Sequence, residues 1–256
     1  MVGSIGNLLW EARTTGTKLD GDFCGAPTTE GEAYSLQSEM IVASGEKLIG
    51  WKIGATAEAL FGVLGVSGPF VGPLFDRFTY SNADTVVIQP GNALETEITI
   101  RVKADMPSRK VAYNRDEILN AVDNVYASFE VVGARFEGDL AGAGCRLIAD
   151  GGANVATVLG EEIQDWRKTD FQKYPISLFI NDELIKEGSP SVLLWEHIFD
   201  SVSWLAAHSA LAERGLKSGD IIMTGTCTGI SPLNPGDRAE AHFGGIAKIS
   251  ASFVYS

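Results

Sequence analysis

The stretch Ala93 to Lys103, A-L-E-T-E-I-T-I-R-V-K, governs how we interpret the rest of the chain. Apolar and polar residues alternate along it and several are β-branched, which is typical of a β-strand whose successive side chains point to opposite faces. Glu95 and Glu97 then point to the same face. Two carboxylates placed in this way repel each other, and burying them together costs free energy unless a cation or a shared proton compensates.

Two interpretations of this carboxylate pair remain open from the residues alone. A hard divalent cation such as Mg²⁺, Mn²⁺ or Ca²⁺ would compensate the charge, because such ions take oxygen ligands. Alternatively, Glu95 and Glu97 lie on a solvated edge strand, where exposed pairs of acids are common. A third acid, Glu130, lies in another strand-like run, F-E-V-V-G-A-R-F. Three carboxylates on strands could fill part of an octahedral shell and leave positions for water and substrate.

The composition is that of a globular protein and excludes several classes of partner. The chain has 256 residues, of which 45% are hydrophobic and 21% charged, so it can bury a substantial core. Twenty Lys and Arg oppose 33 Asp and Glu, and the formal charge of −13 repels phosphate backbones and anionic membranes. We therefore expect no nucleic-acid or membrane partner. A small anionic substrate would need a local cation or metal to overcome this field.

Targeting signals and cysteine usage both indicate the cytoplasm. No apolar stretch approaches the length of a membrane span, and the first ten residues lack the basic start and apolar core of a signal peptide. Cys24, Cys145 and Cys227 are odd in number and lack metal-ligand spacing, as expected of reduced thiols. These features predict a soluble cytoplasmic protein.

Local patterns predict helices near the N-terminus and mostly strands after it. Residues 5–44 have interrupted helical patterns, and Thr29-x-x-Glu32 is a capping box. Asn114-x-x-Glu117 begins a predicted helix through I-L-N-A-V-D-N-V-Y-A-S-F, and residues 192–215 predict helix in one or two pieces. The other runs after residue 148 predict strands, with I-S-L-F-I-N-D-E-L-I-K-E-G as a hairpin.

This arrangement predicts an α+β fold with no internal repeat and no low-complexity linker. We expect a single domain over residues 1–256. A helical N-terminal subdomain would cover about residues 1–47, and a β-rich core would cover about residues 48–256.

Two charged residues outside the acidic strand have both a structural and a functional interpretation. Lys52 lies in the strand-like run L-I-G-W-K-I-G-A-T, where it either reaches the surface or is held inward beside a negative charge. The stretch S-G-P-F-V-G-P-L-F-D-R-F is dense in Gly and Pro, which predicts an apolar loop that covers a pocket. Asp76 within it either caps the backbone or pairs with Arg77, or serves that pocket.

Several segments match one known family in the same order. They are A-Y-S-L-Q, G-W-K-I-G-A-T, G-V-S-G-P-F-V-G-P-L-F-D, L-E-T-E-I, F-E-V-V-G-A-R, and G-L-K-S-G-D-I-I-M-T-G-T with its later P-G-D. From about Tyr34 onward, this ordered set resembles the 2-keto-4-pentenoate hydratase / 4-oxalocrotonate decarboxylase family, within the fumarylacetoacetate hydrolase superfamily. The resemblance implies a mixed β-sheet roll around a metal site, usually in homo-oligomers.

The resemblance also implies metal-binding and catalytic roles by position. Glu95 and Glu97 match the family's E-x-E ligands and Glu130 its third carboxylate, with Mg²⁺ or Mn²⁺ as the cofactor. Lys52 is similar to the active-site lysine of the family's K-I-G segment. Asp76 falls where the family has an acid after its mobile loop, which implies a catalytic acid or base.

Four further positions match segments that bind substrate in the family. They are Gly54 of the K-I-G segment, Thr224 and Gly225 at the substrate end, and Asp150. Where the family commonly has A-D-N-A-S-S, this chain has A-D-G-G-A-N up to Asn154, so Asp150 is retained while small hydroxyls are missing. The segment T-G-T-C-T-G is closer to the hydrolase branch.

The function that the resemblance implies is a metal-dependent hydratase that adds water to a short 2-hydroxy-2,4-dienoate in catabolism. The metal would chelate the carboxylate and 2-oxygen of a small 2-keto acid and stabilise enolate charge. A 4-oxalocrotonate-type decarboxylase and an acylpyruvate or fumarylacetoacetate-type carbon–carbon hydrolase are the alternatives, because one such site can serve all three reactions. A non-catalytic scaffold with the same fold is the alternative from another class.

Overall fold

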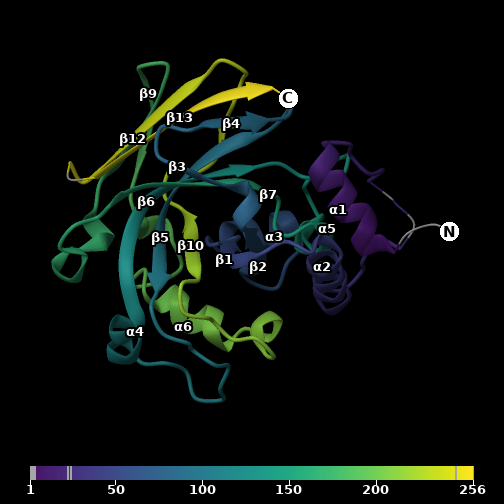
Figure 1. The fold of residues 1–256 in the computed structure, drawn as a ribbon, viewed down its shortest axis with the longest axis horizontal. Helices are drawn as coiled ribbons and strands as arrows, with labels where there is room; N and C mark the ends of the chain where they lie inside the picture. The colour runs from purple at the N-terminus through teal and green to yellow at the C-terminus, as the bar shows by residue number, and fades with distance from the viewer. Residues whose placement is uncertain (1–3, 22, 24, 246, 256) are drawn as a thin grey trace.

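Two β-sheets form the body of the protein (Figure 1). The computed structural model describes residues 4–21, 23, 25–245 and 247–255. The larger sheet has the order β2-β1-β10-β5-β6-β7-β3, with β11 paired to β5, and the smaller sheet has the order β4-β13-β12-β8-β9. Parallel and antiparallel pairs occur in both sheets, and β13 packs against β6 and β7, so the core lies where the sheets meet. This confirms the predicted α+β fold with mixed sheets.

The strands of the larger sheet are β1 (Leu48–Gly54), β2 (Phe70–Phe75), β3 (Thr79–Ser81), β5 (Ala93–Val102), β6 (Val122–Val132), β7 (Asn154–Glu162), β10 (Ile221–Thr226) and β11 (Ser231–Pro232). Those of the smaller sheet are β4 (Thr85–Ile88), β8 (Ile176–Ile180), β9 (Glu183–Gly188), β12 (Arg238–Phe243) and β13 (Ala247–Tyr255). The α-helices are α1 (Ile5–Thr15), α2 (Glu30–Ser44), α3 (Ala59–Leu64), α4 (Arg115–Ala121), α5 (Gly144–Ala149) and α6 (Asp200–Ala207). Short 3₁₀ helices are η1 (Asp76–Phe78), η2 (Trp166–Lys168), η3 (Phe171–Lys173), η4 (Pro190–Val192) and η5 (Ser209–Leu211).

Strand β5 is the predicted acidic strand, and it lies in the middle of the larger sheet. It pairs antiparallel with β10 on one side and β6 on the other, and nearly all of its residues are buried. Both faces of β5 are therefore covered, which rules out the solvated edge strand. Its two acids must be accommodated inside the protein.

Helices α1, α2 and α5 gather beside β1 and β2, away from α4 and α6 (Figure 1). The capping box of α2 is present: the Thr29 hydroxyl accepts from Glu32 N, and the Glu32 carboxylate accepts from Thr29 N. Gln37 of α2 donates to the carbonyl oxygens of Val71 and Ile148, both at hydrogen-bonding distance (2.8 and 2.7 Å). Gln37 thus ties α2 to strand β2 and to helix α5.

Two sequence-based predictions of local structure are wrong. The helix that begins at Asn114 ends at Ala121, and the residues from Val122 onward form β6, because pairing with β5 and β7 outweighs their helical periodicity. The Gly/Pro-rich stretch contains strand β2 rather than only loop. β2 lies at the edge of its sheet, where Pro73 is tolerated although it lacks an N–H.

Other local predictions are confirmed. The hairpin of β8 and β9 turns at Asn181 and Asp182, both with positive φ, as a two-residue turn requires. The helix predicted over residues 192–215 is confirmed in two pieces, α6 and η5, but its extent was wrong, because α6 begins only at Asp200. Cys145 and Cys227 are free thiols, and Cys24 lies outside the described residues. Among the described helices none is long and apolar enough to cross a membrane.

Candidate metal centre and its pocket

Strand register brings three carboxylates together in the larger sheet. Glu95 of β5 lies directly opposite Glu130 of β6, and Glu97 follows two residues after Glu95 on the same face. The three side chains are buried, and one carboxylate oxygen from each lies within 4.8 Å of the others. Like charges opposite each other on paired strands are destabilising, and burial increases that cost. The cluster therefore requires positive charge or bound protons.

Two of the acids each have one oxygen held by a hydrogen bond. Gly225 N donates to Glu97 Oε2 at 2.9 Å, and Asn154 Nδ2 donates to Glu130 Oε1 at 2.9 Å. Glu97 Oε1 is buried and accepts no hydrogen bond from any described residue. A buried carboxylate oxygen without a donor is unusual, and a divalent cation is a ligand that would satisfy it. The donor set, three carboxylates with oriented oxygens, fits Mg²⁺ or Mn²⁺.

Lys52 supplies a positive charge beside the cluster. Its Nζ lies 3.2 Å from Glu130 Oε2 and donates to the carbonyl oxygen of Gly152 at 3.0 Å. The side chain is buried, so of the two interpretations of Lys52 the structure selects the inward one. Burial would lower the pKa of Lys52, but the attraction of Glu130, Glu95 and Glu97 outweighs it and raises that pKa. Lys52 is accordingly held as a cation.

The pKa values of two carboxyl groups are also raised, which favours their neutral form. Burial, followed by repulsion from Glu130, raises the pKa of Glu95 to about 7. The same two causes, with repulsion from Glu95 added, raise the pKa of Glu97 well above its usual range. One lysine thus does not neutralise three acids, and without further positive charge the cluster retains protons near neutral pH.

A cavity of about 270 Å³, which we call the Glu95 pocket, opens beside the cluster. Glu95, Lys52, Thr56 and Thr226 are its polar side chains, and the remaining wall is apolar or backbone. The apolar side chains include Leu60, Leu64, Phe70, Leu140, Leu147 and Ile230. Lys52 is the basic side chain in the described wall of this pocket.

Gly151 and Gly152 shape the wall next to Lys52. Both have positive φ, which favours glycine, and a Cβ on Gly152 would lie 3.0 Å from Lys52 Cδ and 3.3 Å from the Phe70 ring. The G-G of the segment A-D-G-G-A-N thus lets the lysine and the loop approach closely. The end of this segment supplies Asn154, which holds Glu130.

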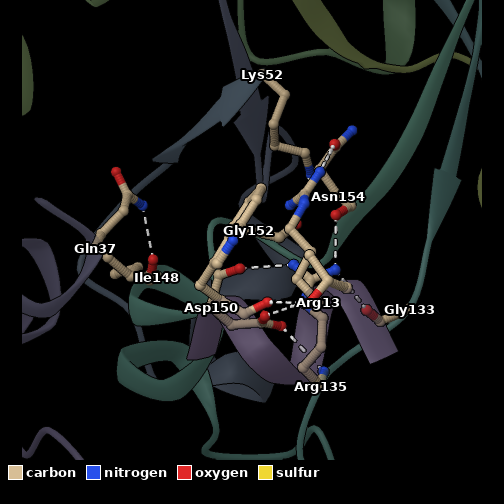
Figure 2. A network of polar contacts seen from close by, with 11 residues as sticks. Arg13, Gln37, Lys52, Gly133, Arg135, Ile148, Asp150, Gly152 and Asn154 are labelled. Atoms are coloured by element: carbon tan, nitrogen blue, oxygen red, sulfur yellow. Dashed lines mark hydrogen bonds and ion pairs between the residues drawn. The ribbon is translucent and has the colours of Figure 1, made fainter. Parts of the chain in front are cut away.

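Behind the acids lies a polar network, shown in Figure 2. Arg13 of α1 donates from Nη2 to Asn154 Oδ1 at 2.8 Å, so Asn154 links a guanidinium to Glu130. Arg135 forms an ion pair with Asp150 and donates from Nη1 to Asn154 O at 2.6 Å and from Nη2 to Asp150 O at 2.6 Å. The network fixes the orientation of Asn154 and thereby of Glu130.

Only some of the four predicted substrate-binding residues lie at the pocket or the acids. Gly54 lines the Glu95 pocket. The Thr224 hydroxyl is buried and donates to Ile98 O, so it serves the sheet and does not line the pocket, whereas Gly225 contacts Glu97. Asp150 is buried against Arg135 and does not line the pocket. Its link to Glu130 runs through Arg135 and Asn154.

Asp76 is not brought to the cluster. It lies in η1, beyond the end of β2, with an exposed carboxylate 3.6 Å from Lys47 Nζ. Lys52 pairs with Gly72, and the three strand residues after Gly72 put the end of β2 about 10 Å along the strand from that point, before η1 begins. Asp76 therefore pairs with Lys47 and not with the adjacent Arg77, which contacts Glu46.

Three residues at the site were not anticipated from sequence. Asn154, Arg13 and Arg135 lie far apart in the chain and meet only through the fold. For Asn154 a signal existed, because it ends the segment in which this chain departs from the family pattern. Arg135 ends the segment F-E-V-V-G-A-R that matches the family, whereas Arg13 carries no comparable local signal.

Comparison with known proteins agrees with this geometry. Residues 75–254 match the family model described as "Fumarylacetoacetate (FAA) hydrolase C-terminal". The chain is 30% identical over 238 residues to 4-oxalocrotonate decarboxylase of Pseudomonas sp. (strain CF600), covering 88% of this chain and 86% of that one. It is 28% identical over 229 residues to 2-keto-4-pentenoate hydratase of Paraburkholderia xenovorans (strain LB400), covering 87% and 83%.

A solved structure shares nearly the whole fold. It is 4-oxalocrotonate decarboxylase from Pseudomonas putida G7 complexed with magnesium and adipate, with a TM-score of 0.86 and 25% identity, covering 98% of this chain and 96% of that one. The same enzyme complexed with calcium and acetate gives a TM-score of 0.85 at 26% identity, with the same coverage. The match of the family model to most of the chain, the relatives and the shared fold establish that this protein belongs to the fumarylacetoacetate hydrolase family of enzymes.

Proposed function

We propose that this protein is a divalent-metal-dependent lyase that adds water to a short 2-hydroxy-2,4-dienoate. The observation that carries the proposal is the buried trio Glu95, Glu97 and Glu130 beside Lys52, at the side of a small and otherwise apolar pocket. Relatives that align over most of the chain are named as hydratases and decarboxylases, and related solved structures contain magnesium or calcium.

The three carboxylates would hold Mg²⁺ or Mn²⁺, with Gly225 and Asn154 orienting two of them. A metal held there would supply Lewis-acid stabilisation of negative charge on the 2-oxygen of the substrate. It would also supply the attraction for an anion that a chain with a formal charge of −13 otherwise lacks.

The protein's own groups would position the substrate and move a proton. Lys52, kept protonated by the neighbouring acids, would donate a hydrogen bond or a proton from Nζ toward the reacting end of the substrate. The apolar wall, including Phe70 and Leu64, would exclude bulk water and so strengthen these polar contacts. We assign no role to Asp76, because its side chain is exposed and outside the pocket.

The wall composition favours a monocarboxylate over a dicarboxylate. Beyond the polar side formed by Lys52, Glu95, Thr56 and Thr226, the described wall offers no second basic side chain. A second carboxylate, as in 4-oxalocrotonate, would lose its hydration against leucine and phenylalanine side chains without an ionic partner. A dienoate with an uncharged tail avoids this cost. The pocket therefore favours the hydratase reaction over decarboxylation of 4-oxalocrotonate.

Decarboxylation of 4-oxalocrotonate is the second candidate, because both a relative at 30% identity and the solved structure with a TM-score of 0.86 are decarboxylases. Mass analysis of products separates the two. The protein would be incubated with Mg²⁺ and either 2-hydroxypenta-2,4-dienoate or 4-oxalocrotonate. We expect gain of one water from the dienoate; loss of carbon dioxide from 4-oxalocrotonate without hydration of the dienoate would establish the decarboxylase. No conversion of either substrate with any divalent metal would contradict the lyase proposal.

A further inference from the structure

The Glu95 pocket changes character from its buried end to its open end. Its charged groups lie at the buried end, where Lys52 and Glu95 are only 4% and 8% exposed. Three large apolar side chains of its wall reach the surface, and we call them the apolar rim: Leu60 (38% exposed), Leu140 (42%) and Ile230 (53%). A ligand held by a charged head at the buried end would extend its other end toward these side chains.

The apolar rim is assembled from three separate segments of the chain. Leu60 belongs to α3, Leu140 precedes α5, and Ile230 lies between β10 and β11. Helix α3, A-L-F-G-V-L, has no buried residue although it consists of apolar residues and one glycine. A single exposed leucine is ordinary, but apolar side chains that converge on one cavity are typical of a ligand-binding site.

Hydrogen bonds to the backbone hold the segments of the rim in place. Gly142 N donates to Val63 O at 2.8 Å, which joins the chain after Leu140 to α3. Lys186 Nζ of β9 donates to Ile230 O at 2.7 Å. A wall whose backbone is already fixed loses less conformational entropy when a ligand binds, so more of the apolar contact appears as affinity.

The pocket is larger than the shortest substrate of the proposed class requires. Its volume of about 270 Å³ equals the share of about nine water molecules in the liquid, at roughly 30 Å³ each. 2-Hydroxypenta-2,4-dienoate has fewer non-hydrogen atoms than that, and bonded atoms occupy less space than separate waters. This substrate would therefore leave part of the pocket beside the apolar rim unfilled.

We propose that the apolar rim is the subsite for an alkyl tail, and that the preferred substrate carries an apolar chain longer than that of 2-hydroxypenta-2,4-dienoate. The inference rests on the proposed function for the head of the substrate and adds the class of its tail. Each methylene that leaves water for the rim should tighten binding about two- to fourfold, until the tail passes the rim.

Unreactive 2-oxo acids test the subsite apart from the reaction. Saturated monocarboxylates, from 2-oxobutanoate through 2-oxohexanoate to 2-oxooctanoate, would be titrated by calorimetry into the protein with Mg²⁺. We expect the affinity to rise along this series. Leu140→Ser should weaken 2-oxooctanoate about fivefold more than it weakens 2-oxobutanoate. Val63→Ser is the matched control, because Val63 is exposed on α3 and does not line the pocket, and it should keep the chain-length dependence of the unaltered protein.

Two results would overturn the tail subsite. One is an affinity that stays level or falls as the chain lengthens. The other is a chain-length dependence that Leu140→Ser leaves intact while it changes the molar mass of the protein in light scattering, which would assign the rim to a contact between subunits.

Kinetics keep the subsite distinct from the proposed function. We expect a higher kcat/KM for 2-hydroxyocta-2,4-dienoate than for 2-hydroxypenta-2,4-dienoate. Conversion of the shorter dienoate together with a level binding series contradicts the subsite alone. A rising binding series without conversion of either dienoate supports the subsite and contradicts the hydratase reaction.

Discussion

The acidic cluster and the arginine network are neighbours of opposite charge, and they are built in different ways. Glu95, Glu97 and Glu130 come from adjacent paired strands and share one face, whereas Arg13 and Arg135 come from a helix and a loop far apart in the chain. Asn154 joins the two groups, accepting from Arg13 and donating to Glu130. The acids have Lys52 as their neighbouring cation, whereas Asp150 supplies a carboxylate to the arginine network. The comparison indicates that the three buried acids need positive charge beyond one lysine, while the arginine network contains its own acid.

Among the variants, loss of one acid of the metal centre should have the largest effect on turnover. Glu97→Gln keeps the shape but removes the charge and the free oxygen anion, so we expect turnover to fall about a thousandfold, roughly 4 kcal/mol. Steady-state kinetics at saturating Mg²⁺ would measure it. Glu183→Gln, an exposed glutamate on β9 of the other sheet, is the matched control and should keep full activity. Full metal-dependent turnover in Glu97→Gln would show that the acids are not the ligands.

The pH dependence of stability tests whether the buried acids lack enough neighbouring positive charge in the metal-free protein. In the metal-free protein the pKa of Glu95 is about 7, above its usual 4.5, so the folded state binds the proton more tightly than the unfolded state. This contribution to the free energy of unfolding is fully present below about pH 4.5 and is lost as the pH rises through about 7. The shift corresponds to an energy on the order of 3 kcal/mol. Urea unfolding between pH 5 and 8 would show a smaller decline for Glu95→Gln, and saturating Mg²⁺ should remove the difference.

The variant Lys52→Met tests whether the lysine of the Glu95 pocket acts on the substrate or only balances the charge of the acids. For Lys52→Met we expect about a hundredfold loss of turnover, roughly 3 kcal/mol, while metal still binds. Mn²⁺ affinity should be retained or increased, because the lysine no longer competes for Glu130. Calorimetry with Mn²⁺ beside kinetics separates the two functions. An unfolded variant would instead indicate that Lys52 is structural.

The link between the two groups predicts a smaller effect. Asn154→Ala removes the donor to Glu130 Oε1 and should weaken metal binding about tenfold. Gln37→Ala is the matched control, because Gln37 is also buried and donates to two backbone oxygens but does not contact an acid. It should lower the melting temperature without changing Mn²⁺ affinity. Equal affinity losses in both variants would reduce the role of Asn154 to general packing.

Asp76 should have the smallest effect. Its carboxylate is exposed and pairs at long range with an exposed lysine, so Asp76→Asn should change turnover by less than about twofold. Steady-state kinetics with 2-hydroxypenta-2,4-dienoate would measure it. A large loss of turnover would return Asp76 to the site and would require movement of η1.

What the sequence could predict follows from how local each feature is. The strand carrying Glu95 and Glu97, the capping box at Thr29 and the turn at Asn181 depend on neighbouring residues, and the structure has all of them. The extension of the helix after Ala121 was wrong because pairing between distant strands decided the outcome. The single-domain organisation over residues 1–256 and the homo-oligomer stay predictions.

The site shows the same division. Proximity of Glu130 to Glu95 depends on the register of two strands, which the family resemblance supplied and local patterns could not. The positions of Asp150 and Thr224 were matched by sequence, but their side chains turn to Arg135 and to Ile98 O, and only packing determines such directions. Arg13 reaches the network through helix packing over more than a hundred residues of sequence separation.

The most direct test is an anomalous difference map from crystals grown with Mn²⁺, recorded near the manganese absorption edge. We predict a single strong peak bounded by carboxylate oxygens of Glu95, Glu97 and Glu130, with Lys52 outside the coordination shell. The absence of a peak among these oxygens at saturating Mn²⁺, or a peak held only by other residues, would contradict the assignment of the metal centre.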